Sequence, residues 1–309
     1  MTPSDREKWL AARCLGVGGS DAGVLMACSP HSNIVQLWAQ KTGRLPSTPS
    51  NTRMRWGTRL EGAILDEYEH VTGLAVVPQS EVVPDRVADV AGVPMLRHPD
   101  LGIMLGNLDG CVVDRDRGPG VIDAKTVESR MFGGWLSDGR PPLYILVQLA
   151  HYMEIAGLQW ATIAAFTGLS DDLYIFDMER DAGFGERLME IEDTFWNRYV
   201  KRDQQPPADT SATTARTLRA LYPKDNGTLV KMTGPAVDWA ADFDDLTREI
   251  NEKKIERDKA KTMIIATIGE HTAGVLPDGS GFTYKAGKKN RSLLRAGAKT
   301  LDKLGKATT

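Results

Sequence analysis

The chain has 309 residues, of which 41% are hydrophobic and 26% charged, with a formal net charge of −3. This length allows one large domain with an appendage, and the composition is typical of a globular protein rather than a disordered one. No apolar run approaches the length of a membrane span, and the first residues lack the pattern of a signal peptide. We therefore expect a cytoplasmic protein that has no membrane partner.

Cysteine and histidine usage excludes two classes of metalloprotein. The three cysteines, Cys14, Cys28 and Cys111, form no Cys-x-x-Cys pair, which indicates a reducing compartment, and they are too few for a four-thiolate iron–sulfur cluster. The five histidines form no His-Glu-x-x-His motif, so a zinc hydrolase of that type is not expected.

A helix is predicted up to about Arg13, followed by a glycine-rich turn that ends in Gly18-Gly19-Ser20. Ser20 is a suitable N-cap for the next helix, and a helix N-terminus attracts anions. Arg13 and Ser20 together are therefore candidates for binding a terminal phosphate. The alternative is that the glycines only make a tight turn and Ser20 only caps the helix, and the local sequence favours this alternative.

Two further helices are expected over residues 32–42 and 55–72, separated by a polar, proline-bearing loop. The second has apolar residues at helical spacing and stops at Gly73. Glu61 flanks that apolar stripe, so it can reach inward. A boundary glutamate paired with Arg55 or Arg59 is an equally good interpretation.

A β-hairpin over residues 106–126 carries two acids and a lysine. Its first strand follows Asp109, its turn spans residues 114–120, and its return strand contains Asp123 and Lys125 on one face. Two adjacent carboxylates repel unless a cation lies between them, and hard oxygen ligands suit Mg²⁺ or Mn²⁺. The other interpretation is an Asp-Gly turn beside a solvated edge strand.

The next helix, predicted over residues 143–156, is apolar except for Tyr144, Gln148 and Tyr152, which share one seam. Buried polar groups need partners, so we expect this seam to face a ligand. Two strands over residues 160–167 and 173–178 and a helix over 182–203 complete this region.

The motifs, in order, resemble those of the YqaJ-type viral recombinases, relatives of lambda exonuclease in the PD-(D/E)XK nuclease superfamily. The resemblance covers roughly residues 8–203. It implies an α/β nuclease core with a mixed central sheet flanked by helices. The residues that carry the resemblance are Arg13 with Gly18-Gly19-Ser20, Trp56-Gly57-Thr58 with Glu61, Leu108-Asp109-Gly110, Asp123-Ala124-Lys125, and Gln148 with Tyr152.

The resemblance also implies roles for these residues. Glu61, Asp109 and Asp123 would bind Mg²⁺ or Mn²⁺, with the carbonyl group of Ala124 as a further ligand. Lys125 would activate or position the attacking water. Asp123 stands where the lambda enzyme has a glutamate, which the superfamily pattern allows.

Binding residues for DNA are implied in the same way. Gln148 would support the water or the scissile phosphate, and Tyr152 belongs to the same DNA-binding set. Arg13 and Ser20 match a 5′-phosphate pocket, in which Asn107 replaces a further serine and can still donate a hydrogen bond.

The C-terminal third lies outside this core. Residues 206–234 are expected to be a linker between a domain at 1–205 and a helical appendage at 235–309. A long helix over 235–268 carries an amphipathic seam that would pack on the body or on a partner, and a hairpin follows it. The basic tail, residues 285–309, has eight Lys or Arg and one Asp, which favours contact with DNA.

The expected activity is that of a Mg²⁺-dependent 5′→3′ exonuclease on double-stranded DNA ends, which leaves 3′ overhangs for a single-strand annealing protein in phage-type recombination. A homo-oligomer is expected. The alternatives are a RecB-like repair nuclease of other polarity and a catalytically inactive module that binds DNA ends.

Overall fold

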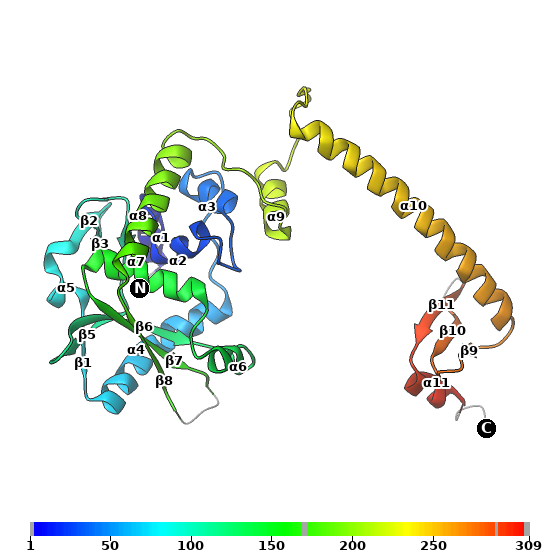
Figure 1. Cartoon of the computed structure of the whole chain (residues 1–309), viewed down its shortest axis with the longest axis horizontal. Helices are drawn as coiled ribbons and strands as arrows, with labels where there is room; N and C mark the ends of the chain where they lie inside the picture. The colour runs from blue at the N-terminus through cyan, green and yellow to red at the C-terminus, as the bar shows by residue number, and fades with distance from the viewer. Residues whose placement is uncertain (1–2, 169–171, 288–289, 306–309) are drawn as a thin grey trace. The chain divides into compact units, whose positions relative to one another are not determined.

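The computed structural model describes residues 3–168, 172–287 and 290–305. The chain divides into two compact units, Met1–Asp225 and Asn226–Thr309 (Figure 1). The helices of the first unit are α1 (Pro3–Arg13), α2 (Gly19–Leu25), α3 (Ile34–Lys41), α4 (Thr52–Thr72), α5 (Gln79–Val82), α6 (Ser129–Asp138), α7 (Leu143–Ala156), α8 (Ala182–Phe195) and α9 (Ala212–Leu221), with a 3-10 turn at Pro84–Arg86 and a π-helical turn at Trp196–Val200. Its strands are β1 (Ala75–Val77), β2 (Val87–Val90), β3 (Val93–Arg97), β4 (Leu105–Gly106), β5 (Gly110–Asp114), β6 (Gly118–Thr126), β7 (Trp160–Phe166) and β8 (Tyr174–Glu179).

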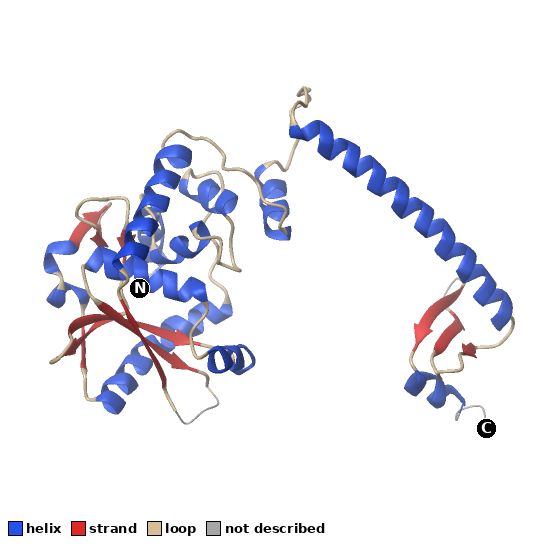
Figure 2. Cartoon of the chain, in the orientation of Figure 1, coloured by secondary structure: helices blue, strands red, loops and turns tan. Residues whose placement is uncertain are grey.

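The central sheet of the first unit has five strands in the order β1-β5-β6-β7-β8. Strands β6 and β7 run parallel, and the other neighbouring strands are antiparallel. Helices cover this sheet (Figure 2). The mixed sheet flanked by helices is the architecture predicted from the sequence, so the fold class is confirmed.

Alternate residues of β5 and β6 enter two different hydrophobic clusters. Cys111 and Val121 pack with α7, whereas Val112 and Ile122 pack with α4. Because strand side chains alternate between faces, Asp123 and Lys125 share the face of Val121. The central strand thus directs both charged side chains towards the side of the sheet covered by α7.

Several helix boundaries agree with the sequence to within a few residues. Helix α4 begins three residues before the expected start, because the Asn51 side chain accepts a hydrogen bond from the Met54 N–H (2.9 Å) and caps it. Gly73 and Gly157 end α4 and α7 in left-handed conformations, with φ of 69° and 71°.

Three features differ from expectation. The small sheet β2-β3-β4 and helix α6 were not predicted. The expected linker, residues 206–234, contains α9, which contacts α3 through Asn33 and Thr217. The part of this segment up to Asp225 therefore belongs with the first compact unit.

The second unit contains α10 (Pro235–Ile268), β9 (Ala273–Val275), β10 (Gly281–Ala286), β11 (Arg291–Ala296) and α11 (Ala298–Gly305). The long helix and the β9–β10 hairpin lie where the sequence predicts them. The segment expected as a basic tail instead folds into part of β10, β11 and α11. Arg291 donates hydrogen bonds to backbone carbonyl groups, among them those of Gly269 (2.8 Å) and Tyr284 (2.8 Å). It therefore joins the end of α10 to the sheet. None of the described helices is both long enough and apolar enough to span a bilayer.

Candidate active site

Asp109 and Asp123 face each other at the open end of the β5–β6 hairpin. Gly110 pairs with Ile122 in the antiparallel register, so the next position along each strand is an aspartate. The backbone N–H of Ala124 donates to Asp109 Oδ2 (2.9 Å), which turns Asp109 towards β6. Asp123 is 1% exposed. The hairpin therefore places two carboxylates together, one of them fully buried.

Lys125 lies beside these acids. Its Nζ is 2.5 Å from Asp123 Oδ2, across two positions of the same strand. Burial alone would lower the pKa of Lys125, but the carboxylates of Asp123 and Asp109 outweigh burial and raise it. The lysine therefore stays protonated and supplies one positive charge next to the two acids.

Helix α7 adds an amide and a phenol. Gln148 Nε2 donates to Asp123 Oδ1 (3.4 Å) and to the Tyr152 hydroxyl (3.2 Å). Tyr144, the third member of the predicted seam, instead makes an edge contact with His31, with ring centroids 5.4 Å apart. Gln148 therefore contacts both Asp123 and Tyr152, whereas Tyr144 packs elsewhere.

The carboxylates at this site repel one another. Burial, and then the charge of Asp123, raise the pKa of Asp109 to about 7, and Lys125 opposes the shift only in part. Two carboxylates that share a site cannot both ionise freely without a cation. The site therefore carries more negative charge than Lys125 neutralises.

Glu61 lies on α4, the helix that covers the opposite face of the sheet. Burial raises the pKa of its half-buried carboxyl group, and the charge of Asp123 raises it further while Lys125 lowers it. No hydrogen bond or ion pair joins Glu61 to Asp109 or Asp123 in the part of the chain that the structure describes. Glu61 is thus within electrostatic reach of the hairpin acids without touching them.

The donor set fits a divalent cation. Asp123 Oδ2 is buried and accepts no hydrogen bond of regular geometry, although the Lys125 ammonium lies close to it. Carboxylate and carbonyl oxygens are the ligands that Mg²⁺ and Mn²⁺ prefer. Among the described residues, no three His, Cys, Asp or Glu side chains lie close enough together to form a complete metal site.

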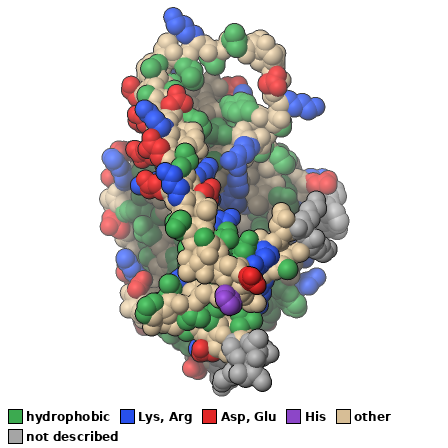
Figure 3. Space-filling model, turned by 90° about the vertical axis from the view of Figure 1, so that its right-hand side faces the viewer, with side chains coloured by type: hydrophobic (Ala, Val, Ile, Leu, Met, Phe, Trp, Pro, Cys, Tyr) green, Lys and Arg blue, Asp and Glu red, His purple; other side chains and the backbone are tan. Residues whose placement is uncertain are grey.

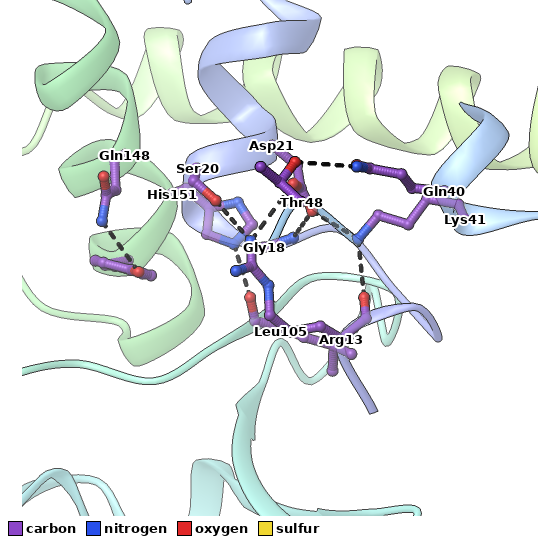
Figure 4. A network of polar contacts seen from close by, with 11 residues as sticks. Arg13, Gly18, Ser20, Asp21, Gln40, Lys41, Thr48, Leu105, Gln148 and His151 are labelled. Carbon is purple, nitrogen blue, oxygen red and sulfur yellow. Dashed lines mark hydrogen bonds and ion pairs between the residues drawn. The ribbon is translucent and has the colours of Figure 1, made fainter. Parts of the chain in front are cut away.

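A second charged cluster joins α1, α2 and α3 (Figure 4). Arg13 Nη2 donates to Ser20 Oγ (2.6 Å) and lies 3.5 Å from Asp21 Oδ1. Lys41 Nζ lies 2.6 Å from Asp21 Oδ2 and donates to the Arg13 carbonyl group (2.8 Å). Burial would raise the pKa of Asp21, but Lys41 and Arg13 together lower it. Two cations share one acid here, so the cluster has a surplus positive charge.

The expectation that Ser20 caps α2 is wrong. Gly18 occupies the N-cap position, with φ of −101° and ψ of 166°, and its N–H donates to Asp21 Oδ2 (2.9 Å). Ser20 lies inside the first turn, which frees its hydroxyl group to accept from Arg13. The serine is therefore held by the guanidinium rather than by the helix backbone.

Tyr152 connects the two clusters. A Cβ atom on Gly19 would lie 2.7 Å from the Tyr152 ring, and a Cβ atom on Gly106 would lie 3.1 Å from it. Glycine is thus required beside the ring at Gly19, and a side chain at Gly106 would fit only if the ring shifted. Next to it on α7, His151 Nε2 lies 3.1 Å from the Leu105 carbonyl oxygen. These contacts form a continuous path from α2 through Tyr152 and Gln148 to Asp123.

Asn107 occupies a separate position at the end of β4. Its Nδ2 donates weakly to the Pro94 carbonyl group (3.4 Å), and its Oδ1 is buried without a hydrogen-bond partner. No described contact joins it to Arg13 or Ser20. The structure thus brings Arg13 and Ser20 together but leaves Asn107 outside that pair.

The sequence analysis missed Asp21, Lys41 and the packing role of Gly19. Asp21 directly follows the glycine-rich turn Gly18-Gly19-Ser20, so the sequence alone could have indicated an acid at this point. Lys41 lies 28 residues from Arg13, and nothing in the local sequence indicates that the two meet.

Several known proteins are similar to this chain. Residues 8–159 match the YqaJ-like viral recombinase domain. The YqaJ protein of Bacillus subtilis (strain 168) is 26% identical over 231 residues, which cover 74% of this chain and 67% of that protein. The fold of this chain is similar to that of LHK-Exo, an alkaline exonuclease from Laribacter hongkongensis, in two crystal structures, one of them in complex with dAMP. In both comparisons the TM-score is 0.50 and the sequence identity is 22%, over 64% of this chain and 97% of LHK-Exo. Residues 8–159 of the chain therefore form a YqaJ-like viral recombinase domain.

Proposed function

We propose that the protein is a Mg²⁺-dependent nuclease that degrades double-stranded DNA from its 5′ ends. The observation that carries this proposal is the pair of facing aspartates, Asp109 and Asp123, with Lys125 beside them at 2.5 Å. The surplus of negative charge suits a divalent cation, and the lysine suits an anionic substrate. These are the requirements for hydrolysis of a phosphodiester.

Asp109, Asp123 and Glu61, with the carbonyl oxygen of Ala124, are the groups that would hold Mg²⁺ or Mn²⁺. The cation supplies Lewis-acid stabilisation of the phosphate and lowers the pKa of water. Since Lys125 is protonated, it orients the attacking water and offsets charge on the phosphate. Gln148 donates to Asp123 and Tyr152 and so positions Asp123 within this set.

Arg13 and Ser20 are proposed to bind the 5′-phosphate. A guanidinium can contact a phosphate through two N–H groups. The Ser20 hydroxyl oxygen lies 2.6 Å from the Arg13 guanidinium. Because Asp21 takes only part of the charge of Arg13 and Lys41, an anion can still bind here. Tyr152 lies between this pocket and Asp123, which would seat the end of the strand beside the acids. Asn107 is proposed as a weaker contact to the same strand.

The named relatives support an exonuclease in particular. LHK-Exo is an alkaline exonuclease, and one of its crystal structures contains dAMP, a single deoxynucleotide. By the proposed polarity, digestion leaves a 3′ single strand, which would be the substrate of an annealing protein during recombination.

Digestion of a duplex that carries free 5′-phosphates and a different fluorophore at each 3′ end tests the proposal. With Mg²⁺, we expect mononucleotides to be released from the 5′-phosphorylated strand and the 3′ label to persist on single-stranded DNA. Asp123→Ala should be inactive, whereas Asp116→Ala, which changes an exposed acid in the turn of the same hairpin, should be as active as the wild type. Loss of the 3′ label first would contradict the polarity and favour the RecB-like alternative, and no Mg²⁺-dependent product would contradict the proposal.

A further inference from the structure

A histidine and a glutamate form a fully buried pair next to the candidate active site. His151 of α7 and Glu192 of α8 are both 0% exposed. By contrast, the face drawn in Figure 3 presents its acidic and basic side chains to solvent. In a buried pair, the cost of removing both groups from water offsets much of their attraction. Net stability therefore does not account for this pair.

Both ring nitrogens of His151 have a partner. Nδ1 lies 2.8 Å from Glu192 Oε1, and Nε2 lies 3.1 Å from the Leu105 carbonyl oxygen (Figure 4). Because a carbonyl oxygen can only accept a hydrogen bond, Nε2 carries a hydrogen atom whatever the charge of the pair. The two contacts hold the ring in one orientation between α8 and β4.

Leu105 in turn binds the segment that leads into the glycine-rich turn Gly18-Gly19-Ser20. The Leu105 N–H donates to the Val17 carbonyl group (2.8 Å), and the Val17 N–H donates to the Ile103 carbonyl group (2.7 Å). Val17 directly precedes the glycine-rich turn. Through β4, His151 is therefore joined to the start of this turn.

Packing against Tyr152 leaves this arrangement little room to shift. A Cβ atom on Gly19 would lie 2.7 Å from the Tyr152 ring, and one on Gly106 would lie 3.1 Å from it. The ring centroids of Tyr152 and His151 are 5.9 Å apart. The hydrogen bond from His151 thus holds β4, while the Tyr152 ring stops the turn from moving closer to α7.

We propose that His151, held by Glu192, is a positioning residue that fixes the glycine-rich turn on α7 and thereby the 5′-phosphate pocket. This inference rests on the proposed function, in which Arg13 and Ser20 bind the phosphate. The pair does not touch the DNA itself. It acts through the backbone of β4 on the turn that carries Ser20.

Helix α7 connects this pocket with the hairpin acids. One turn before His151, Gln148 donates to Asp123 (3.4 Å). The same helix therefore holds an acid at one position and the glycine-rich turn at the next. A displacement of about 1 Å far from the chemistry can cost roughly 10²-fold in rate, so a loosened turn should bind the phosphate less well.

Binding of short blunt duplexes in EDTA tests the inference without any cleavage. Each duplex carries a fluorophore at its 3′ ends and either 5′-phosphate or 5′-hydroxyl groups, and fluorescence anisotropy gives the ratio of the two dissociation constants. The wild type should prefer the phosphate by about tenfold, through a charge-assisted bidentate contact. Arg13→Ala should lose this preference.

Two amide variants separate the two hydrogen bonds of the ring. Glutamine places its side-chain nitrogen about where Nε2 of histidine lies, and asparagine about where Nδ1 lies. His151→Gln can still donate to Leu105 and should keep the preference, whereas His151→Asn can reach only Glu192 and should lower it by about fivefold. Glu154→Gln is the matched control, since it removes the charge of another buried acid of α7, paired with Arg180 at 2.7 Å, and it should keep the preference.

Urea unfolding shows whether each variant is folded. If His151→Asn does not fold, Glu192→Met, which removes the partner of Nδ1, should lower the preference in the same direction. A wild type without a phosphate preference would contradict the 5′-phosphate pocket and this inference with it. The wild-type preference in folded His151→Asn or in Glu192→Met, or equal losses in His151→Asn and His151→Gln, would overturn the inference while the pocket stands.

Discussion

Two charged clusters meet at Tyr152, and they are opposite in electrostatic character. Around Asp123, acids outnumber the single cation, and the pKa of Asp109 is raised to about 7 by burial and by its neighbouring acid. Around Asp21, cations outnumber the single acid, and Lys41 and Arg13 lower the pKa of Asp21 despite its burial. The first cluster therefore carries an excess of negative charge, which a cation would offset, whereas the second carries an excess of positive charge, which an anion would offset.

The largest expected effect comes from removing an acid of the first cluster. Asp123→Ala, Asp109→Ala and Lys125→Ala should each lower the rate of Mg²⁺-dependent cleavage by roughly 10³-fold, because each removes a proposed metal ligand or the charge proposed to lie beside the phosphate. Single-turnover digestion of a 5′-phosphorylated duplex measures the rate. Glu61→Gln should lower it less, since Glu61 does not touch the other acids. A rate within tenfold of the wild type for Asp123→Ala would contradict the metal assignment.

The second cluster should respond in stability. Asp21→Asn leaves Lys41, with 5% of its side chain exposed, without its acid, and we expect a loss of about 3 kcal/mol in the free energy of unfolding at pH 7. Because the folded-state pKa of Asp21 is lowered, its stabilisation is present above the unfolded value of 3.8 and is lost as the pH falls through the folded pKa. Urea unfolding should therefore show the two proteins converging below pH 3.8. Equal stability at pH 7 would mean that Asp21 does not hold the cluster together.

Arg13→Ala tests the anion-binding role of the second cluster. Digestion of 5′-phosphorylated duplex should slow by about tenfold, towards the rate with 5′-hydroxyl duplex, because one bidentate phosphate contact is lost. Thermal stabilisation by Mg²⁺ should be unchanged, since Arg13 does not contact the hairpin acids. If the wild type cleaves both kinds of end equally and Arg13→Ala is harmless, the pocket assignment is wrong.

In the first cluster, an Asp→Asn change should have the opposite effect on the free energy of unfolding. The pKa of Asp109 is raised to about 7, so its contribution to stability is present below the unfolded value and is lost as the pH rises through 7. Without metal, Asp109→Asn should equal the wild type in stability below pH 3.8 and should be more stable than it by roughly 1 kcal/mol or more at pH 8. Differential scanning calorimetry in EDTA measures this difference. A destabilised variant at pH 8 would show that the acids do not repel as described.

Local signals in the sequence were sufficient for much of the first cluster. The turn at residues 114–120 and strand alternation placed Asp109, Asp123 and Lys125 together, and glycine stop signals placed the ends of α4 and α7. The family resemblance was needed for Glu61, because helix periodicity alone allowed equally well a boundary glutamate paired with Arg55 or Arg59. Whether these residues carry the proposed roles stays a prediction.

The remaining features depend on contacts that are distant in sequence or too short to leave a pattern. Strands β2 to β4 have two to five residues each, which is below the length at which alternation can be recognised. Helix α6 contains Gly133 and Gly134, which disfavour a helix. Ser20 was predicted to cap α2 because its residue type favours that position. That Gly18 takes the position instead, with its N–H bonded to Asp21, depends on how the turn folds. No helix or strand was predicted within the basic tail, because nothing local shows that Arg291 binds the end of α10.

Calorimetric titration of Mn²⁺ into the protein without DNA tests the central claim most directly, namely that the hairpin acids form a site short of one cation. Because protons and metal compete for a carboxyl group with a pKa of about 7, the affinity should rise about tenfold between pH 6 and pH 8. Asp123→Ala should bind no metal, and Asp116→Ala should bind as the wild type does. Binding by Asp123→Ala equal to that of the wild type at both pH values would contradict the account.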